Sequence, residues 1–184
     1  MQRRAAKEEV NGGRWIMNTK PVARNATGHN VDENRRVTPE RMLLDTVDRV
    51  RRMREGRAAI HIHLSDLHPQ NKSEAHLRIA LRLLESLVSG YRCQTFVLTN
   101  DDIVILGKDI PEEDAAVVLS RLRAMFSNDP LTQDDPGDGQ DPFATWYDLE
   151  HDFDRFSDLT HALFTAGEER MFARAHGPPP NPNP

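Results

Sequence analysis

The segment formed by residues 94–108 constrains the fold more than any other part of the sequence, because β-rich runs flank a short polar tip within it. The runs contain Phe, Val, Ile and Leu, which favour the pleated and half-buried surface of a sheet. The tip, at 99–102, contains Asn and Asp, which tolerate left-handed backbone and hydrogen-bond to their own turns. The segment therefore predicts a β-hairpin with strands at 94–98 and 103–108.

Neighbouring carboxylates at this tip, Asp101 and Asp102, allow a second interpretation. Carboxylate oxygens are the ligands that Mg²⁺ and Ca²⁺ prefer, so the pair could hold a divalent cation. A solvated hairpin tip explains the same residues without any chemistry, because Asp is common in turns. We predict the solvated tip and keep the metal as the alternative.

Length and composition predict one domain with a core of its own. The chain has 184 residues, of which 38% are hydrophobic, enough for one ordinary core but not for two. Asp and Glu outnumber Lys and Arg by 29 to 24, which gives a formal net charge of −5. Because this charge works against attraction to a phosphate backbone, nucleic acid is a disfavoured partner.

The cysteine content and the absence of a long apolar run predict the compartment. The single cysteine, Cys93, permits no internal disulfide and no thiolate metal cluster, which fits a reducing environment. No apolar run in the sequence approaches the roughly twenty residues that span a bilayer, so we expect no membrane partner. We therefore expect a cytoplasmic protein.

The apolar periodicity alternates between that of helices and that of strands along the chain. It predicts helices at 38–55, 73–89, 111–126 and 152–174, and strands at 58–64 and 143–149 besides the hairpin. The resulting order, αβαββαβα, contains the β-α-β-β-α-β unit of a ferredoxin-like fold. We therefore predict an α+β domain, ferredoxin-like or nucleotidyl-cyclase-like, whose βαββαβ antiparallel sheet has flanking helices.

Local signals mark the ends of several elements. Thr38 as N-cap, followed by Pro39, begins the first helix, and Gly56 ends it. Asp109 and Glu112 resemble a capping box at the start of the third helix. Residues 127–142, which are rich in Asp, Gly and Pro, predict an acidic loop.

The ends of the chain lack apolar periodicity. Residues 1–36 mix charge, Gly and Asn and predict a disordered segment, followed by the helix within 37–56. Residues 177–184 are almost wholly Pro and Asn, as in a tail or an interdomain linker. We expect the folded domain at 57–176.

Several stretches of this domain, taken together, resemble the motifs of one known family. The tip Thr99-Asn100-Asp101-Asp102, followed by Ile103, lies where that family has Gly-Gly-Asp-Glu-Phe. The stretch Ser73-Glu74-Ala75-His76-Leu77 looks like a degraded copy of the family's Gly-Asp-x-x-Leu helix start. The family is that of the GGDEF domains, which make cyclic di-GMP from two GTP molecules. The resemblance implies a nucleotidyl-cyclase-like fold.

The departures from the family pattern imply that its activity is lost. Thr99 and Asn100 replace the glycines that let backbone approach the nucleotide phosphates. His63 replaces the metal-binding Asp that ends the family's first strand, and Ser65 replaces its second Asp. Because Mg²⁺ prefers oxygen ligands, an imidazole weakens such a site. Asp102 is one methylene shorter than the family's Glu, which displaces a catalytic carboxylate.

The resemblance also locates remnants of the family's nucleotide sites. The base-recognising Asn and Asp fall near Asn71 and Glu74, and the short helix between them is missing, so we expect a guanine pocket without walls. The family's Arg-x-x-Asp product site falls at residues 90–93, where Arg92 is displaced and no acid follows. We therefore expect no product inhibition through that site.

We expect no catalytic residue, no cofactor and no bound metal. Mg²⁺ enters only if some activity remains, and its candidate ligands are then His63, Asp101 and Asp102. His61 and His63 share one strand face, and with His68 nearby they could form a metal site. Packing under a helix explains these histidines as well, and we prefer that explanation.

Basic and aromatic residues also carry alternative interpretations. Five arginines cluster near the end of the first helix and form either a solvated face or a surface for an acidic partner; they are Arg49, Arg51, Arg52, Arg54 and Arg57. Phe143, Trp146 and Tyr147 could stack on a nucleic-acid base, but aromatic residues on a strand are more often part of the core.

The preferred hypothesis is a catalytically inactive GGDEF-like regulatory or protein-interaction domain, in signalling of the cyclic di-GMP type. Its partner is then another protein or a tethered output domain, and the helix at 38–55 allows a weak homodimer. One alternative is a weak nucleotide or metal sensor, or a residual diguanylate cyclase, that uses Asp101 and Asp102. Another is a ferredoxin-like nucleic-acid-binding module.

Overall fold

Four strands form one antiparallel sheet in the part of the chain that the structure describes. The structure is a computed structural model that describes residues 37–133 and 141–177, which belong to one compact unit spanning Arg36–Pro184. The strands are β1 (Arg57–Ile62), β2 (Gln94–Val97), β3 (Ile103–Lys108) and β4 (Ala144–Asp148), and they lie in the order β2-β3-β1-β4. Each neighbouring pair is antiparallel, so the predicted mixed helix and antiparallel-sheet class is confirmed.

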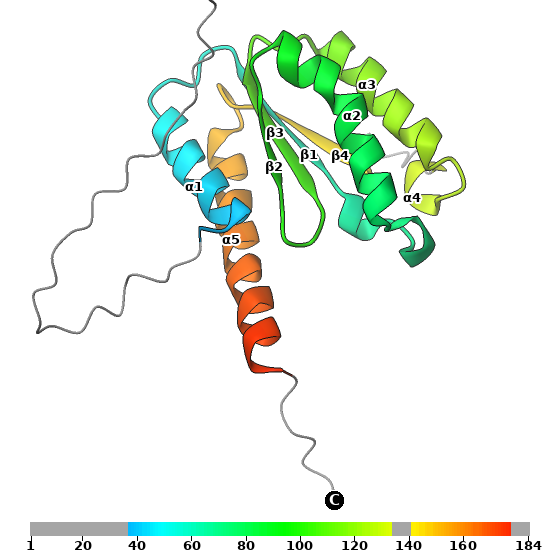
Figure 1. Cartoon of the computed structure of the whole chain (residues 1–184). Coiled ribbons are helices and arrows are strands. Elements are labelled where there is room, and N and C mark those ends of the chain that lie inside the picture. The colour runs from blue at the N-terminus through cyan, green and yellow to red at the C-terminus, as the bar shows by residue number, and fades with distance from the viewer. Residues whose placement is uncertain (1–36, 134–140, 178–184) are drawn as a thin grey trace, which may run out of the picture. The chain divides into compact units, whose positions relative to one another are not determined.

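Helices cover both faces of this sheet. Figure 1 shows α2 (Glu74–Gly90) and α3 (Glu112–Met125) on one face, and α1 (Pro39–Val50) and α5 (Phe153–His176) on the other. Between β1 and α2 the chain forms short 3-10 turns, and a short helix, α4 (Pro130–Gln133), follows α3. We call the two sides the α2/α3 face and the α1/α5 face.

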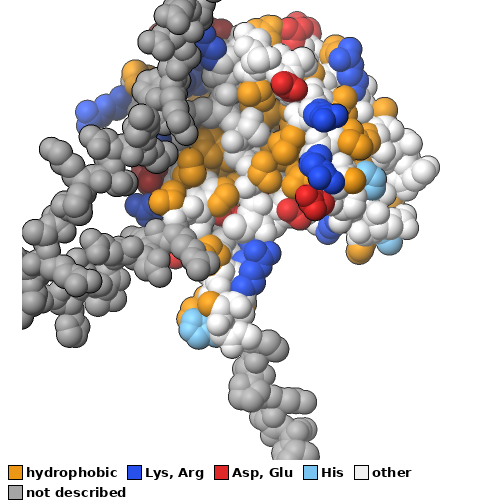
Figure 2. Space-filling view, in the orientation of Figure 1, with side chains coloured by type: hydrophobic (Ala, Val, Ile, Leu, Met, Phe, Trp, Pro, Cys, Tyr) orange, Lys and Arg blue, Asp and Glu red, His pale blue; other side chains and the backbone are white. Residues whose placement is uncertain are grey.

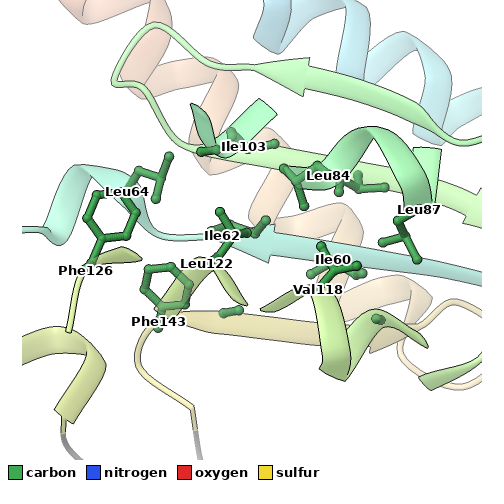
Figure 3. Packing of buried hydrophobic residues seen from close by; sticks show 14 of the residues in the cluster. Ile60, Ile62, Leu64, Leu84, Leu87, Ile103, Val118, Leu122, Phe126 and Phe143 are labelled. Carbon is green, nitrogen blue, oxygen red and sulfur yellow. The ribbon is translucent and has the colours of Figure 1, made fainter. Parts of the chain in front are cut away.

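The α2/α3 face carries an apolar core. Alternate residues of β1 and β3 point to this side, as the period of a strand requires. Leu84 and Leu87 of α2 and Val118 and Leu122 of α3 pack onto them (Figure 3). The aromatic rings of Phe126 and Phe143 lie at the edge of the same cluster. The strand residues that face this core are Ile60, Ile62, Ile103 and Ile105.

The α1/α5 face carries a second core, and α1 uses its apolar stripe there. Leu43, Val47 and Val50 of α1 are buried against the sheet together with Phe153 and Phe156 of α5. The intervening strand residues complete this core; they are Ala59, Phe96, Val104, Leu106 and Tyr147. The helix for which we predicted a homodimer therefore packs its stripe inside its own domain, and the dimer stays a prediction.

The hairpin lies where the sequence predicts it, between β2 and β3. The backbone N–H of Leu98 donates to the carbonyl of Asp102 at 2.8 Å, and that of Asp101 donates to the carbonyl of Leu98 at 3.0 Å. Asp101 has φ of +73°, the left-handed conformation that Asp tolerates better than most residues. The loop is therefore closed by Asp101, while Asp102 already belongs to the strand side.

The first helix is shorter than predicted. It begins as expected, with the Thr38 hydroxyl accepting a bond from the Arg41 N–H at 3.1 Å, but it ends at Val50 and not near residue 55. Beyond Val50 the next position of the stripe is Arg54, whose guanidinium lies over the ring of Phe153, 4.0 Å from its centroid. The chain instead turns through residues 51–56 into β1, and the apolar residue of this segment, Met53, is 60% exposed.

Two further local predictions are wrong. The third helix has no capping box, because its N-cap is Pro111 and no side chain bonds to its first turn. The N–H of Asp109 donates instead to the carbonyl of Gly56 at 2.6 Å, across from β3 to the residue before β1. The segment 127–142 is not loop alone, because α4 lies within it and Asp129 before α4 is 1% exposed.

The expectations for residues 1–36 and 178–184 lie outside the described residues, as does part of the acidic loop. Among the described helices, none is both long and apolar enough to cross a membrane. On the face drawn in Figure 2, Lys and Arg side chains lie among Asp, Glu and hydrophobic ones rather than in a field of one sign.

Candidate functional site

The side chain of Asp102 is turned into the molecule, so the predicted solvated hairpin tip is wrong for this residue. It is 3% exposed, and its Oδ1 accepts a bond from the backbone N–H of Ser65 at 2.8 Å. Its Oδ2 accepts from the amide of Asn100 at 2.8 Å and lies 3.2 Å from Nε2 of His61. Both carboxylate oxygens are therefore engaged by neighbouring residues of the domain.

Two histidines lie next to this carboxylate. The rings of His61, on β1, and His63, just after it, have centroids 4.1 Å apart and planes tilted by 51°. His61 is 3% exposed, and its Nδ1 is buried without a hydrogen-bond partner among the described residues. His63 is half-buried, and its Nε2 lies 3.0 Å from the hydroxyl of Thr145 on β4.

The electrostatics of this group favour an ionised carboxylate beside a neutral imidazole. Burial opposes ionisation of Asp102, but the hydrogen bonds from His61 and Ser65 outweigh it and hold its pKa below the ordinary 3.8. Burial, and then the neighbouring His61, lower the pKa of His63 below the ordinary 6.5. Near pH 7 the Asp102 carboxylate is therefore ionised and the His63 ring is neutral.

His61, His63 and Asp102 form a group of metal-ligating side chains, which we call the His-His-Asp cluster. One ligand atom from each lies within 4.8 Å of the others. The sequence singled out His63 and Asp102 as candidate ligands, and the structure brings them together with His61. Asp101 is exposed and is not in this group. His68 is not in it either, and its backbone N–H donates to Asp129 at 2.8 Å.

A second polar network, which sequence reasoning missed, holds the hairpin tip against α1 and α5. The carboxylate of Glu40 is fully buried, and its Oε1 accepts from the N–H of Thr99 at 2.8 Å and from its hydroxyl at 2.5 Å. Arg170 of α5 donates to the Thr99 hydroxyl at 2.9 Å and to Glu40 at 3.3 Å. Both the backbone and the side chain of Thr99 are thus bonded to Glu40.

Glu40 owes its burial to α1 and to a glycine in α5. It lies three residues before Leu43, on the same stripe, which is the signal that could have found it. A Cβ at Gly167 would lie 2.9 Å from its Cδ, so only glycine fits there without movement. Burial raises the pKa of Glu40, but the bonds from Thr99 and Arg170 reverse this and lower it below 4.5.

Asn71 and Glu74, which the resemblance predicts as nucleotide-site residues, line a small hollow together with Asp101, Leu64 and Phe126. The volume of this hollow is only about 150 Å³. Ligand pockets usually have at least roughly 300 Å³, so a nucleotide does not fit without rearrangement. The amide of Asn71 donates to buried Asp129 at 2.7 Å, and Glu74 is exposed.

A basic hollow lies at the opposite end of the sheet from the hairpin tip. Its volume is about 470 Å³, and its lining includes four cationic side chains besides Asp109; they are Arg49, Arg57, Arg92 and Lys108. Among the described residues, none of these four forms an ion pair with a carboxylate within 4.0 Å. We call this cavity the basic hollow. Arg49 and Arg57 in its lining belong to the arginine cluster that the sequence analysis singled out.

The aromatic residues of the last strand belong mainly to the two cores. Phe143 is fully buried and Tyr147 is 6% exposed, so neither ring is free to stack on a base. Trp146 is half-buried and lines a groove of about 480 Å³ beside β4. Arg123 and Asp141 form an ion pair across this groove.

Comparison with known proteins finds no relative of this chain. No family model matches the chain, and neither a curated protein nor a solved structure is significantly similar to it.

Proposed function

We propose that the chain carries a catalytically inactive GGDEF-like domain that acts as a regulatory or protein-interaction module. The element order β1-α2-β2-β3-α3-β4, with the sheet order β2-β3-β1-β4, supports a ferredoxin-like and nucleotidyl-cyclase-like fold for it. Fold alone implies no activity, so the proposal depends on the hairpin.

The burial of Asp102 is the observation that carries the proposal. A catalytic carboxylate in such a site must face the substrate, whereas this one accepts bonds from Ser65, Asn100 and His61 inside the domain. Asp101 faces the small hollow on the other side. The two acids of the tip therefore do not converge on one ion or one substrate atom.

The tip itself supports the same conclusion. Thr99 and Asn100 both use their side chains to bond within the domain, where the resemblance implies backbone open to phosphates. The small hollow leaves too little volume for a nucleotide. Cyclic di-GMP synthesis would require the tip, Glu40 and Arg170 to separate.

A direct assay tests the claim that the domain is catalytically inactive. The purified chain is incubated with GTP and either Mg²⁺ or Mn²⁺, and cyclic di-GMP is measured by mass spectrometry beside an active GGDEF cyclase. We expect no product. Synthesis by the parent chain that is abolished by Asp102→Asn would contradict the proposal and support a residual cyclase.

The basic hollow supports the claim that the domain binds a protein partner. The four cations of this hollow pair with no carboxylate of residues 37–133 and 141–177, so they suit an acidic protein surface or an acidic segment of a tethered domain. The probe is a fluorescent glutamate-rich peptide, and binding is followed by anisotropy at low salt.

We expect the double variant Arg57→Glu, Lys108→Glu to lose binding of this peptide. The variant Arg82→Glu, which changes an exposed arginine of α2 outside the hollow, should retain it. Equal loss in both variants would show nonspecific charge attraction. Tighter binding of a single-stranded RNA than of the peptide would support the nucleic-acid alternative instead.

A further inference from the structure

The His-His-Asp cluster has a donor chemistry that the proposed function does not use. Imidazole nitrogens suit Zn²⁺, Cu²⁺, Ni²⁺ and Fe²⁺, whereas Mg²⁺ prefers a shell of oxygens. Two imidazoles with one carboxylate are a common donor set for Zn²⁺ sites with an open position. The cluster therefore fits a different class of ion from the one that the GGDEF resemblance implies.

We propose that His61, His63 and Asp102 bind one zinc-class transition-metal ion, which joins the end of β1 to the start of β3. The donors come from separate segments that the antiparallel register brings together, since His61 pairs with Val104 and Ile62 with Ile103. This inference does not rest on the proposed function, because a silent domain and an active one could each hold such an ion.

The distances within the cluster are close to those that one ion requires. Zn²⁺ bonds to nitrogen and oxygen are about 2.0–2.2 Å long, so two ligands of one ion lie at most roughly 4.4 Å apart. The ligand atoms of the cluster lie within 4.8 Å of one another, and the His61 and Asp102 atoms are 3.2 Å apart. Because ligands of a tetrahedral ion lie roughly 3.4 Å apart, a pair at 4.8 Å must close by roughly 1.4 Å. His63 is half-buried and can supply this movement.

The buried imidazole of His61 also has a nitrogen without a hydrogen-bond partner among the described residues. Nδ1 of His61 is buried without a partner, whereas buried polar atoms nearly always have one. Leaving such an atom unpaired costs about 1–3 kcal/mol. Nε2, the His61 atom beside Asp102, is the one that would bind the ion, and Nδ1 would then carry the ring proton.

The surroundings of the cluster resemble the outer shell of a metal site. Ser65 and Asn100 orient the carboxylate of Asp102, and Thr145 bonds to the His63 ring. Partners of this kind fix the orientation of metal ligands and raise affinity. The partial exposure of His63 also leaves an entry path for an ion.

The test uses the full chain, freed of metal by a chelator that is then removed. Zn²⁺ is titrated by calorimetry and by competition with a chromophoric indicator, and Co²⁺ is added separately so that its visible d–d absorption reports the ligand geometry. We expect one ion per chain, a higher Tm with Zn²⁺, and no heat with Mg²⁺.

His63→Ala is the decisive variant, because His63 is half-buried and its loss leaves both cores intact. Zn²⁺ affinity should fall by more than the roughly 10–100-fold that loss of an outer-shell partner costs. His68→Ala, which changes an exposed neighbour outside the cluster, should leave affinity unchanged. In the parent chain, Zn²⁺ should shift the ¹⁵N resonances of His61 and His63 imidazoles.

Three outcomes would overturn the inference. They are no Zn²⁺ binding at micromolar concentration, unchanged affinity in His63→Ala, and equal loss in His63→Ala and His68→Ala. None of them bears on the cyclase assay, so failure of this inference and failure of the proposed function are distinguishable. A Zn²⁺-bound chain that still makes no cyclic di-GMP supports both.

Discussion

The two faces of the sheet bury different kinds of side chain. The α2/α3 face is filled by Ile, Leu, Val and Phe. The α1/α5 face adds polar groups to its apolar core, among them Glu40, His61 and Asp102. Of the buried polar residues within 37–133 and 141–177, Asp129 is the one that lies on the α2/α3 side.

Because of this difference, the two faces are stabilised in different ways. An apolar face is stabilised in proportion to the area that it buries, whatever the orientation of the groups. A buried polar group contributes only if its own partner is in place, and it costs free energy otherwise. On the α1/α5 face, stability therefore depends also on the pairing and protonation of individual buried groups.

The largest effect is expected on the apolar face. Leu122→Ala empties a fully buried site between α3 and the sheet, and should lower the free energy of unfolding by about 2–5 kcal/mol. Val117→Ala, on the same helix but 51% exposed, should change it by about 0.5 kcal/mol or less. Urea denaturation measures both. Similar losses in the two variants would contradict the assignment of this face.

The next effect breaks the polar network at the hairpin. Arg170→Ala removes the charged partner of buried Glu40 and should cost about 1–3 kcal/mol in urea denaturation. The double variant Glu40→Leu, Arg170→Ala should lose less than the sum of the single variants, because no buried charge is then unpaired. Additive losses would show that Glu40 and Arg170 act independently. Arg174→Ala, which loses only a 3.5 Å bond to Thr99, is the control.

A smaller effect tests the fit of Glu40 against α5. Gly167→Ala places a Cβ 2.9 Å from Glu40 and should cost about 1–3 kcal/mol of overpacking, reduced by about 1 kcal/mol of helix propensity. Gly90→Ala, with no atom within 4 Å of the new Cβ, gains the propensity alone. The two alanine variants should therefore move Tm in opposite directions. A higher Tm in both would show that Glu40 moves freely.

The smallest effect is the pH dependence of Glu40. Because its folded pKa lies below 4.5, it contributes stability that is present above about pH 4.5 and is lost as pH falls through the folded pKa. Glu40→Gln should therefore flatten the acid limb of a plot of unfolding free energy against pH. Asp102 and Asp129 act in the same direction, so the limb should not vanish. An unchanged slope in Glu40→Gln would contradict this account.

The elements with a strong period were predictable from the sequence. The alternation in β1 correctly placed Ile60 and Ile62 on one face and His61 on the other, and the hairpin strands lie within one residue of their predicted ends. The period could not predict where α1 ends, because packing of Arg54 on Phe153 depends on a helix about a hundred residues away.

The candidate site was less predictable, since it depends on pairing between distant segments. The convergence of His61 and His63 with Asp102 follows from the register of β1 against β3, and periodicity in a single sequence does not determine that register. Asp129 lies in a segment without a period, so nothing marked its burial. Glu40 did carry a signal, its place on the stripe of α1.

The packing of α1 against α5 bears on how the protein is made. Synthesis runs from the N-terminus, so α1 leaves the ribosome long before α5, its neighbour on the sheet. The α2/α3 side can close as soon as β4 has emerged, whereas Leu43 and Val47 wait for the last helix. Folding during translation should therefore end with this late, long-range docking step, in which Arg170 reaches Glu40 and Thr99.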